Sequence, residues 1–207
     1  NHRKALQSLK EWITHNPNYA GLETQSGGGG DDLYGSGTED ESSELDQVQG
    51  LLAHALEHDA SPQVHEALGV VYNVSRDYDA AVDSFRAALD QCPNDYGLWN
   101  KLGATQANSQ NSQDALQNYH QALQLRPKYA RAWLNMAISH SNLQNYEEAA
   151  RCYLQTLSLN PRAVHCWSYL RIALSCMERW DLLSLVSTQD LEAFREHFDF
   201  VHYENTA

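Results

Sequence analysis

The sequence lacks the features that mark several classes of protein. No apolar run approaches the roughly 20 residues needed to cross a bilayer, and the first residues do not resemble a secretion signal. It contains no HExxH motif, no glycine-rich phosphate loop after a strand and no Ser/His/Asp array. We therefore expect a soluble chain that is not an enzyme and that has no catalytic residues, no metal site and no cofactor.

Lys and Arg are absent from Glu11 to Ser75, a stretch that carries 12 acidic residues. The formal net charge of −13 is therefore unevenly distributed, because residues 76–162 contain eight basic and eight acidic side chains. Binding to a phosphate backbone requires clustered Lys and Arg. We therefore expect no nucleic-acid partner.

The four cysteines show no CxxC spacing, which argues against a structural zinc site. The chain is long enough to form its own core, so it does not need a disulfide framework. We expect Cys92, Cys152, Cys166 and Cys176 to be buried, reduced thiols.

A period of 34 residues organises the middle of the chain. The segments 62–95, 96–129 and 130–163 align without gaps. Each has a small residue at its positions 8 and 20, an aromatic residue at position 24 and a proline at position 32. In that order of positions, these are Gly69, Gly103 and Ala137; Ala81, Ala115 and Ala149; Phe85, Tyr119 and Tyr153; and Pro93, Pro127 and Pro161.

This pattern resembles the tetratricopeptide repeat, in which two antiparallel helices pack as a hairpin. Small residues at positions 8 and 20 let the two helices approach closely, and the aromatic residue at position 24 fills the space between them. Proline at position 32 ends the second helix because it has no amide donor. We predict an all-α fold, a tetratricopeptide-repeat superhelical solenoid with a C-terminal helical bundle.

The repeat pattern predicts six parts along the chain. Residues 1–19 are expected to be the second helix of a truncated repeat, an open end that exposes apolar surface. We expect a flexible acidic Gly/Ser-rich loop over 20–43 and an irregular hinge-repeat helix over 44–60. Three complete repeats span 62–163, C-terminal helices span 164–200 with a capped helix at about 188–198, and 201–207 form a tail.

The first helix of each such repeat lines a groove with its positions 2, 5, 6, 9, 12 and 13. In the second and third repeats the residues at these positions include two cations and four carboxamides, namely Asn100, Lys101, Asn108, Arg131, Asn135 and Asn142. Asparagine donates to and accepts from a peptide backbone, while Lys and Arg make charge-assisted hydrogen bonds with a carboxylate. We predict that these six residues bind an extended peptide or a terminal carboxylate.

Arg171 is a further candidate in the fourth repeat. It stands at position 8, where the complete repeats have a small residue. Two interpretations are open: a cation that faces the groove, or an arginine that packs and caps a helix.

Two strings carry a more detailed resemblance: WNKLGAT at residues 99–105, and the R-x3-N-x6-N pattern of Arg131, Asn135 and Asn142. With these strings, residues 3–200 resemble the C-terminal domain of the receptor for the type 1 peroxisomal targeting signal, a peroxin family. The family's first two and a half repeats have no counterpart here.

The resemblance implies a seven-repeat ring in which two triplets close around a C-terminal Ser-Lys-Leu-like tripeptide. The six groove residues fall on the family's peptide-binding positions. It further implies a cytoplasmic import receptor that cycles to the peroxisomal membrane. Its partners would be cargo proteins with this signal, and membrane docking proteins that bind through regions outside this chain.

Two rival functions are considered. One is a chaperone-adaptor module that clamps an acidic C-terminal peptide. That class needs Lys at position 5 and Asn at position 9 of one repeat, where the first complete repeat has Glu66 and Val70. The other is a scaffold attached to an enzyme domain, against which the expected terminal helices argue.

Overall fold

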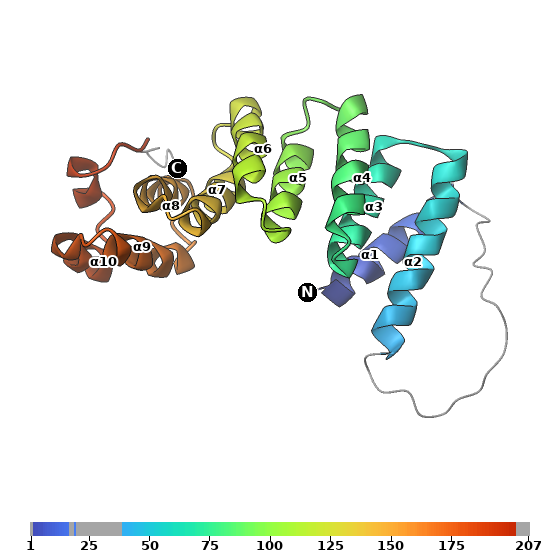
Figure 1. Cartoon of the computed structure of the whole chain (residues 1–207), viewed down its shortest axis with the longest axis horizontal. Helices are drawn as coiled ribbons and strands as arrows, with labels where there is room; N and C mark the ends of the chain where they lie inside the picture. The colour runs from blue at the N-terminus through green and yellow to red at the C-terminus, as the bar shows by residue number, and fades with distance from the viewer. Residues whose placement is uncertain (1, 17–18, 20–38, 202–207) are drawn as a thin grey trace. The chain divides into compact units, whose positions relative to one another are not determined.

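The computed structural model describes residues 2–16, 19 and 39–201, and it contains only helices and connecting turns within these residues. The chain divides into two compact units, Asn1–Pro93 and Asn94–Ala207 (Figure 1). None of the described helices is long and apolar enough to cross a membrane.

The described part of the first unit contains four helices, of which α1, α2 and α3 share one core. Helix α1 packs on α2 and α3, and α3 packs on α4. The core includes Leu6, Val48, Leu52 and Val71, each at most 1% exposed. The four helices are α1 (His2–His15), α2 (Glu39–His58), α3 (Pro62–Ser75) and α4 (Tyr78–Gln91).

The expected exposure of apolar surface at the start of the chain is not found in the described part of the first unit. Leu6 and Ile13 of α1 are each 1% exposed, and Leu9 and Trp12 are partly buried against the same core. Helices α2 and α3 thus bury these apolar side chains of α1. The repeat pattern does not predict this packing, because residues 44–60 lack the repeat register.

Helix α2 begins at Glu39, within the segment 20–43 for which a loop is predicted. The periodic apolar residues that locate a helix in a sequence start only at Leu45. Acidic residues favour the first turn of a helix because its N-terminus carries a partial positive charge. A helix start rich in Glu and Asp therefore gives no apolar signal. The rest of segment 20–43, residues 20–38, lies outside the described residues.

The second unit contains the remaining helices. Consecutive helices pack on one another from α5 through α9, as Figure 1 shows for their side-by-side order. They share a core that includes Tyr119, Met136, Leu154 and Leu170. The helices are α5 (Tyr96–Asn108), α6 (Ser112–Leu125), α7 (Ala130–Asn142), α8 (Tyr146–Leu159), α9 (His165–Cys176), η1 (Trp180–Leu182), α10 (Leu183–Thr188) and η2 (Ala193–Glu196).

The helix starts repeat with the sequence period. First helices begin at residues 62, 96 and 130, and second helices begin at 78, 112 and 146. The residue before two of the second helices caps them, because Asp77 accepts a hydrogen bond from the Ala80 amide and Asn111 from the Asp114 amide. The all-α tetratricopeptide-repeat fold is confirmed.

The turn inside each repeat has the same backbone geometry. The residue at position 15 is left-handed in all three complete repeats, with φ of 65° at Arg76, 66° at Gln110 and 61° at Gln144. The following amide bonds back to the first helix, as the Asn111 amide does with the Gln106 carbonyl at 2.8 Å. Glu178, with φ of 58°, occupies position 15 of a fourth repeat, so the hairpin pattern continues past residue 163.

The single capped helix predicted at about 188–198 is wrong. Helix α10 ends at Thr188, and the 3-10 turn η2 follows after a break. The break occurs because Gln189 is left-handed, with φ of 54°, and Asp190 instead caps the next turn by accepting from the Ala193 amide. The segment predicted as one capped helix is thus the junction of two short elements.

The chain after η2 is held on α8. The Gln155 side chain pairs with the backbone of Val201: its Nε2 donates to the Val201 carbonyl at 2.9 Å, and its Oε1 accepts from the Val201 amide at 2.8 Å. Ser158 Oγ donates to the same carbonyl at 2.9 Å. These bonds fix the last described residue against the third complete repeat.

The cysteines differ in burial. All four are free, but only Cys152 and Cys166 are buried, at 4% and 0% exposure. Cys92 is half-buried and Cys176 is exposed, so the expectation of four buried thiols is wrong for these two. Burial raises the pKa of Cys152 to about 12 and that of Cys166 to about 11.

The burial pattern predicts selective thiol reactivity. In the native protein at pH 8, a thiolate-specific disulfide reagent should label Cys176 rapidly and leave Cys152 and Cys166 unlabelled, because only thiolates react and both buried groups stay protonated. Mass spectrometry of the labelled peptides measures this. Full labelling in guanidinium is the control, and fast native labelling of Cys152 would contradict the described core.

Position 8 sets the distance between the two helices of a repeat. A Cβ atom added to Gly103 would lie 2.7 Å from Tyr119 Cε1 and 3.1 Å from the Ala115 carbonyl oxygen. A Cβ atom added to Gly69 would meet the ring of Phe85 at the same 2.7 Å. The ring at position 24 therefore occupies the space that a side chain at position 8 would need.

Gly103→Ala is expected to destabilise the fold by about 1–3 kcal/mol, since the methyl group overpacks a site with backbone on one side. The matched control is Gly50→Ala on α2, where an added Cβ atom meets nothing within 4 Å. That exchange should stabilise by about 0.5–1 kcal/mol through helix propensity. Urea unfolding of both variants tests the pair, and equal effects would contradict the close approach.

Candidate peptide-binding site

The six residues predicted to bind a peptide lie on two first helices of the second unit. Helix α5 carries three of them and α7 carries the other three. These helices approach each other directly, in addition to both packing on α6. The residues on α5 are Asn100, Lys101 and Asn108, and those on α7 are Arg131, Asn135 and Asn142.

The two helices are linked by a hydrogen bond between two of the predicted residues. Asn135 Nδ2 donates to Asn100 Oδ1 at 3.0 Å. Asn100 is only 4% exposed, whereas Asn135 is half-buried. The bond uses one of the two hydrogens on Asn135 Nδ2 and leaves its Oδ1 to accept from another group. The pair therefore presents a polar surface with a fixed orientation.

Lys101 follows Asn100 on α5, and its side chain is half-buried. Its side chain runs back along the helix, because a Cβ atom added to Gly97 would lie 3.8 Å from Lys101 Nζ. Glycine at position 97 thus leaves room for the ammonium group beside the first turn. The Lys101 carbonyl accepts a hydrogen bond from Thr105 Oγ1 at 3.0 Å, which fixes the turn that carries it.

The other three predicted residues, Asn108, Arg131 and Asn142, are exposed. Arg131 stands in the first turn of α7, and Asn108 and Asn142 are the last residues of α5 and α7. His140, near the end of α7, adds no charge at neutral pH because burial lowers its pKa. Among the described residues of α5 and α7, the cationic side chains at neutral pH are thus Lys101 and Arg131.

The side chains on α5 and α7 have the chemistry to bind the C-terminal end of a peptide. A half-buried ammonium and an exposed guanidinium can each make charge-assisted hydrogen bonds to a carboxylate. Four carboxamides on the same two helices can donate to peptide carbonyls and accept from peptide amides. No group of three or more His, Cys, Asp or Glu side chains that could hold a metal gathers in the part of the chain that the structure describes.

Arg171 contacts the C-terminal elements. Its Nη2 donates to Ser187 Oγ of α10 at 3.2 Å, and the side chain is exposed. Of the two interpretations of Arg171, the structure therefore favours an arginine that ties α9 to the elements after it.

Sequence reasoning missed two exposed apolar residues on α9. Tyr169 and Ile172 are 40% and 59% exposed. They occupy positions 6 and 9 of the fourth repeat, which are groove-facing positions in the repeat pattern. The repeat register places Tyr169 at position 6, as it does Lys101 and Asn135, but the predicted site was based on polar side chains.

Two comparisons of sequence and structure define the class of protein. Profiles described as Tetratricopeptide repeat match residues 130–162 and 45–96. Among solved structures, MamA superposes with a TM-score of 0.67 at 15% identity, covering 80% of this chain and 100% of that one. The first tetratricopeptide repeat domain of Spaghetti (RPAP3), bound to the HSP90 peptide SRMEEVD, gives 0.56 at 22% identity, covering 57% and 94%. The chain has the tetratricopeptide-repeat fold, and at these identities the solved structures show the fold alone.

The sequence relatives are more specific. The Peroxisomal targeting signal 1 receptor of Dictyostelium discoideum is 42% identical over 109 residues, which are 53% of this chain and 17% of that protein. The PEX5-related protein of Rattus norvegicus is 37% identical over 114 residues, 53% and 19% respectively. Over about half its length the chain is thus a homologue of these receptors. The matched region is less than a fifth of the length of either relative.

The Asn100–Asn135 bond predicts an energetic coupling. Asn135→Ala should destabilise by about 1–3 kcal/mol, because it removes the donor to a buried amide oxygen. The double variant with Asn100→Ala should cost less than the sum of the single changes, since the orphaned acceptor is then absent. Chemical unfolding of the three variants measures the coupling. Asn142→Ala, at an exposed position, is the control and should change stability by less than about 0.5 kcal/mol; additive single effects would contradict the bond.

Proposed function

We propose that this chain is the cargo-binding part of a receptor for proteins that end in a Ser-Lys-Leu-type peroxisomal targeting signal. The observation that carries the proposal is the hydrogen-bonded pair Asn100–Asn135, which joins α5 to α7 with Lys101 and Arg131 on the same two helices. The names of the homologous receptors support the choice of ligand.

The proposed mechanism separates two tasks. Lys101 and Arg131 bind the terminal carboxylate of the cargo, an interaction that only the last residue of a protein can satisfy. Asn108, Asn135 and Asn142 bind the peptide backbone and hold it extended. The buried Asn100 orients Asn135 by accepting its hydrogen bond. Recognition of main-chain groups explains how one groove accepts the ends of different cargo proteins.

The proposal includes a cellular role. The receptor binds cargo in the cytoplasm and cycles to the peroxisomal membrane. Docking at that membrane uses regions outside this chain, consistent with the small share of the related receptors that it matches. The function is binding and release of cargo, with no catalytic step.

The chaperone-adaptor alternative predicts a different ligand. A clamp for acidic tails would need more cations on the first helices than Lys101 and Arg131 provide. Within the described first helices α3, α5, α7 and α9, the further basic residue apart from His is Arg171, which contacts Ser187. An acidic peptide ending in Glu-Glu-Val-Asp therefore serves as the competitor in the binding experiments.

Removal of a carboxylate-binding cation tests the mechanism. Lys101→Ala and Arg131→Ala should each weaken binding of a Ser-Lys-Leu peptide about ten-fold or more, because each removes one charge-assisted hydrogen bond to the carboxylate. Fluorescence anisotropy of a labelled decapeptide measures the dissociation constant. Arg162→Ala removes an exposed cation from the loop after α8 and should leave binding unchanged.

The carboxylate itself is tested by amidating the same peptide, which should weaken binding at least as much as either cation variant. Equal binding of the free and amidated peptides would overturn the carboxylate mechanism. Preferential binding of the acidic competitor would favour the adaptor function instead.

A further inference from the structure

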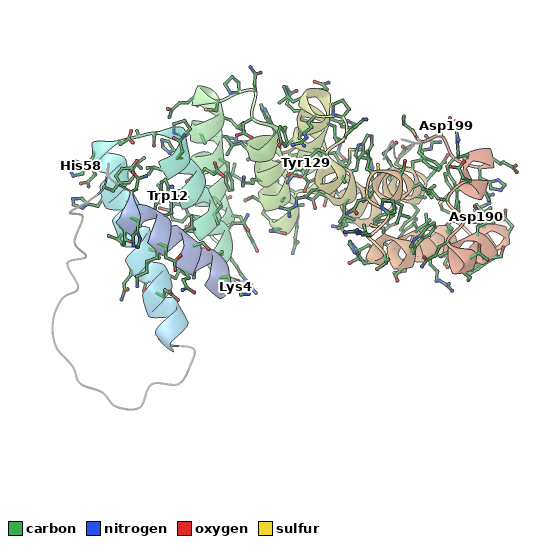
Figure 2. All side chains as sticks on the ribbon, turned by 180° about the vertical axis from the view of Figure 1, so that it is seen from behind. Lys4, Trp12, His58, Tyr129, Asp190 and Asp199 are labelled. Atoms are coloured by element: carbon green, nitrogen blue, oxygen red, sulfur yellow. The ribbon has the colours of Figure 1, made fainter. Side chains whose placement is uncertain are left out.

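The last turn of α2 carries two histidines in the motif H-x-x-E-H. The motif spans residues 54–58 (HALEH), and His58 is the last residue of the helix (Figure 2). Of the ten histidines in the sequence, only His54 and His58 are four residues apart. Two histidines at this spacing on a helix are the ligand pair of zinc-binding helices, which occur with either order of the intervening glutamate. The motif therefore points to a metal ion.

The helix places both imidazoles on one accessible face. Residues four apart are separated by about 40° around a helix and by about 6 Å along it. His54 and His58 are exposed, whereas Ala55 is buried in the core of the first unit. The two ring centroids are 5.1 Å apart, and the ring planes are inclined at 65°. The two rings are therefore neighbours at the surface.

This separation suits a shared metal ion. Zinc lies about 2.0–2.1 Å from an imidazole nitrogen, so two nitrogens on one ion are about 3–4 Å apart. Nitrogens at the facing ring edges lie closer together than the centroids, and rotation of an exposed side chain brings one from each ring into this range. Within the described residues no third His, Cys, Asp or Glu joins the pair. Water therefore fills the other positions, and the pair binds an ion without forming a catalytic zinc site, which takes three protein ligands.

The charges around the pair favour a cation. The C-terminal end of a helix carries a partial negative charge, and α2 ends at His58. Glu57 and Asp59 flank His58, in a stretch, residues 11–75, that contains no Lys or Arg. Imidazole nitrogens suit zinc, copper and nickel, whereas calcium and magnesium take oxygen ligands. The pair therefore selects a divalent ion of the zinc class.

The turn that holds the pair is also where other parts of the first unit attach. Tyr19 Oη donates to Asp59 Oδ2 at 2.7 Å. Gln91 Nε2, at the end of α4, donates to the Ala60 carbonyl at 2.8 Å. The Asp59 amide donates to the Ala55 carbonyl at 2.8 Å. An ion bound by both imidazoles would fix the turn on which these contacts depend.

We propose that His54 and His58 form a binding site for a divalent ion of the zinc class, and that the bound ion stabilises the last turn of α2. An ion that binds the native state in preference to the unfolded chain raises the free energy of unfolding. The site lies in the first unit, whereas the proposed peptide-binding residues lie in the second. The inference is therefore independent of the proposed function.

Isothermal titration of the whole chain with Zn²⁺ tests the site. The double variant His54→Gln/His58→Gln should lack one binding site that the unaltered chain has. Each single variant should bind Zn²⁺ at this site about ten-fold or more weakly, because two linked ligands bind far better than one. His165→Gln, which removes an exposed imidazole from the start of α9, should leave the titration unchanged. Equal titrations of the unaltered chain and the double variant would overturn the site.

A displaced pair tests the spacing. Gly50→His in the His58→Gln chain places an imidazole four residues before His54, at a position where an added Cβ atom meets nothing within 4 Å. This variant should regain the lost site, and failure to do so would overturn the one-turn spacing as its basis.

Urea unfolding tests the effect on α2. Saturating Zn²⁺ should raise the unfolding midpoint of the unaltered chain relative to that of His58→Gln, beyond any difference between the two without Zn²⁺. Because both chains have nearly the same unfolded state, the comparison removes the effect of Zn²⁺ binding to unfolded cysteines. The same difference with and without Zn²⁺ would overturn the stabilisation of the last turn.

Discussion

The fold depends on the contact between a small residue at position 8 and an aromatic ring at position 24. In the first two complete repeats the ring lies where a glycine side chain would begin, and in the third Ala137 and Tyr153 are buried at 0% and 2% exposure. This contact joins the two helices of a hairpin and commits one face of each first helix to the core. The remaining face of the first helix carries positions 6, 9 and 13, where we propose that the ligand binds. The proposed binding surface is therefore a consequence of how the hairpin closes.

Much of this arrangement can be predicted from the sequence because it repeats. The period of 34 residues locates the helices of the complete repeats, since the same local rules act three times. It fails at the ends, where the start of α2 at Glu39 and the break after Thr188 depend on acidic and left-handed residues outside the pattern. For the site, the period places six residues on two helices, but it does not show that Asn100 is buried against Asn135. That contact joins position 5 of one repeat to position 6 of the next, and alignment of equivalent positions carries no information about it.

The negative charge of the chain and the two cations of the predicted site lie in different parts of the sequence. The net charge of −13 arises mainly outside the complete repeats, whose helices α5 and α7 hold the cations Lys101 and Arg131. Electrostatic attraction to a carboxylate at these helices is local, because ionic screening limits it to about 8–10 Å. In the proposed binding mode, the cations recognise the end of the peptide chain and the carboxamides recognise its backbone.

The pairing of Gln155 with the Val201 backbone affects the order in which the molecule assembles. Contacts within a tetratricopeptide hairpin join residues close in sequence and form quickly, whereas this pairing closes a loop across 46 residues. The segment that ends at Val201 can pair only after α8 has formed, so we expect it to dock late in folding. Phe194 and Phe198 of the same segment are buried at 0% and 5% exposure, so this late step also completes the core of the second unit.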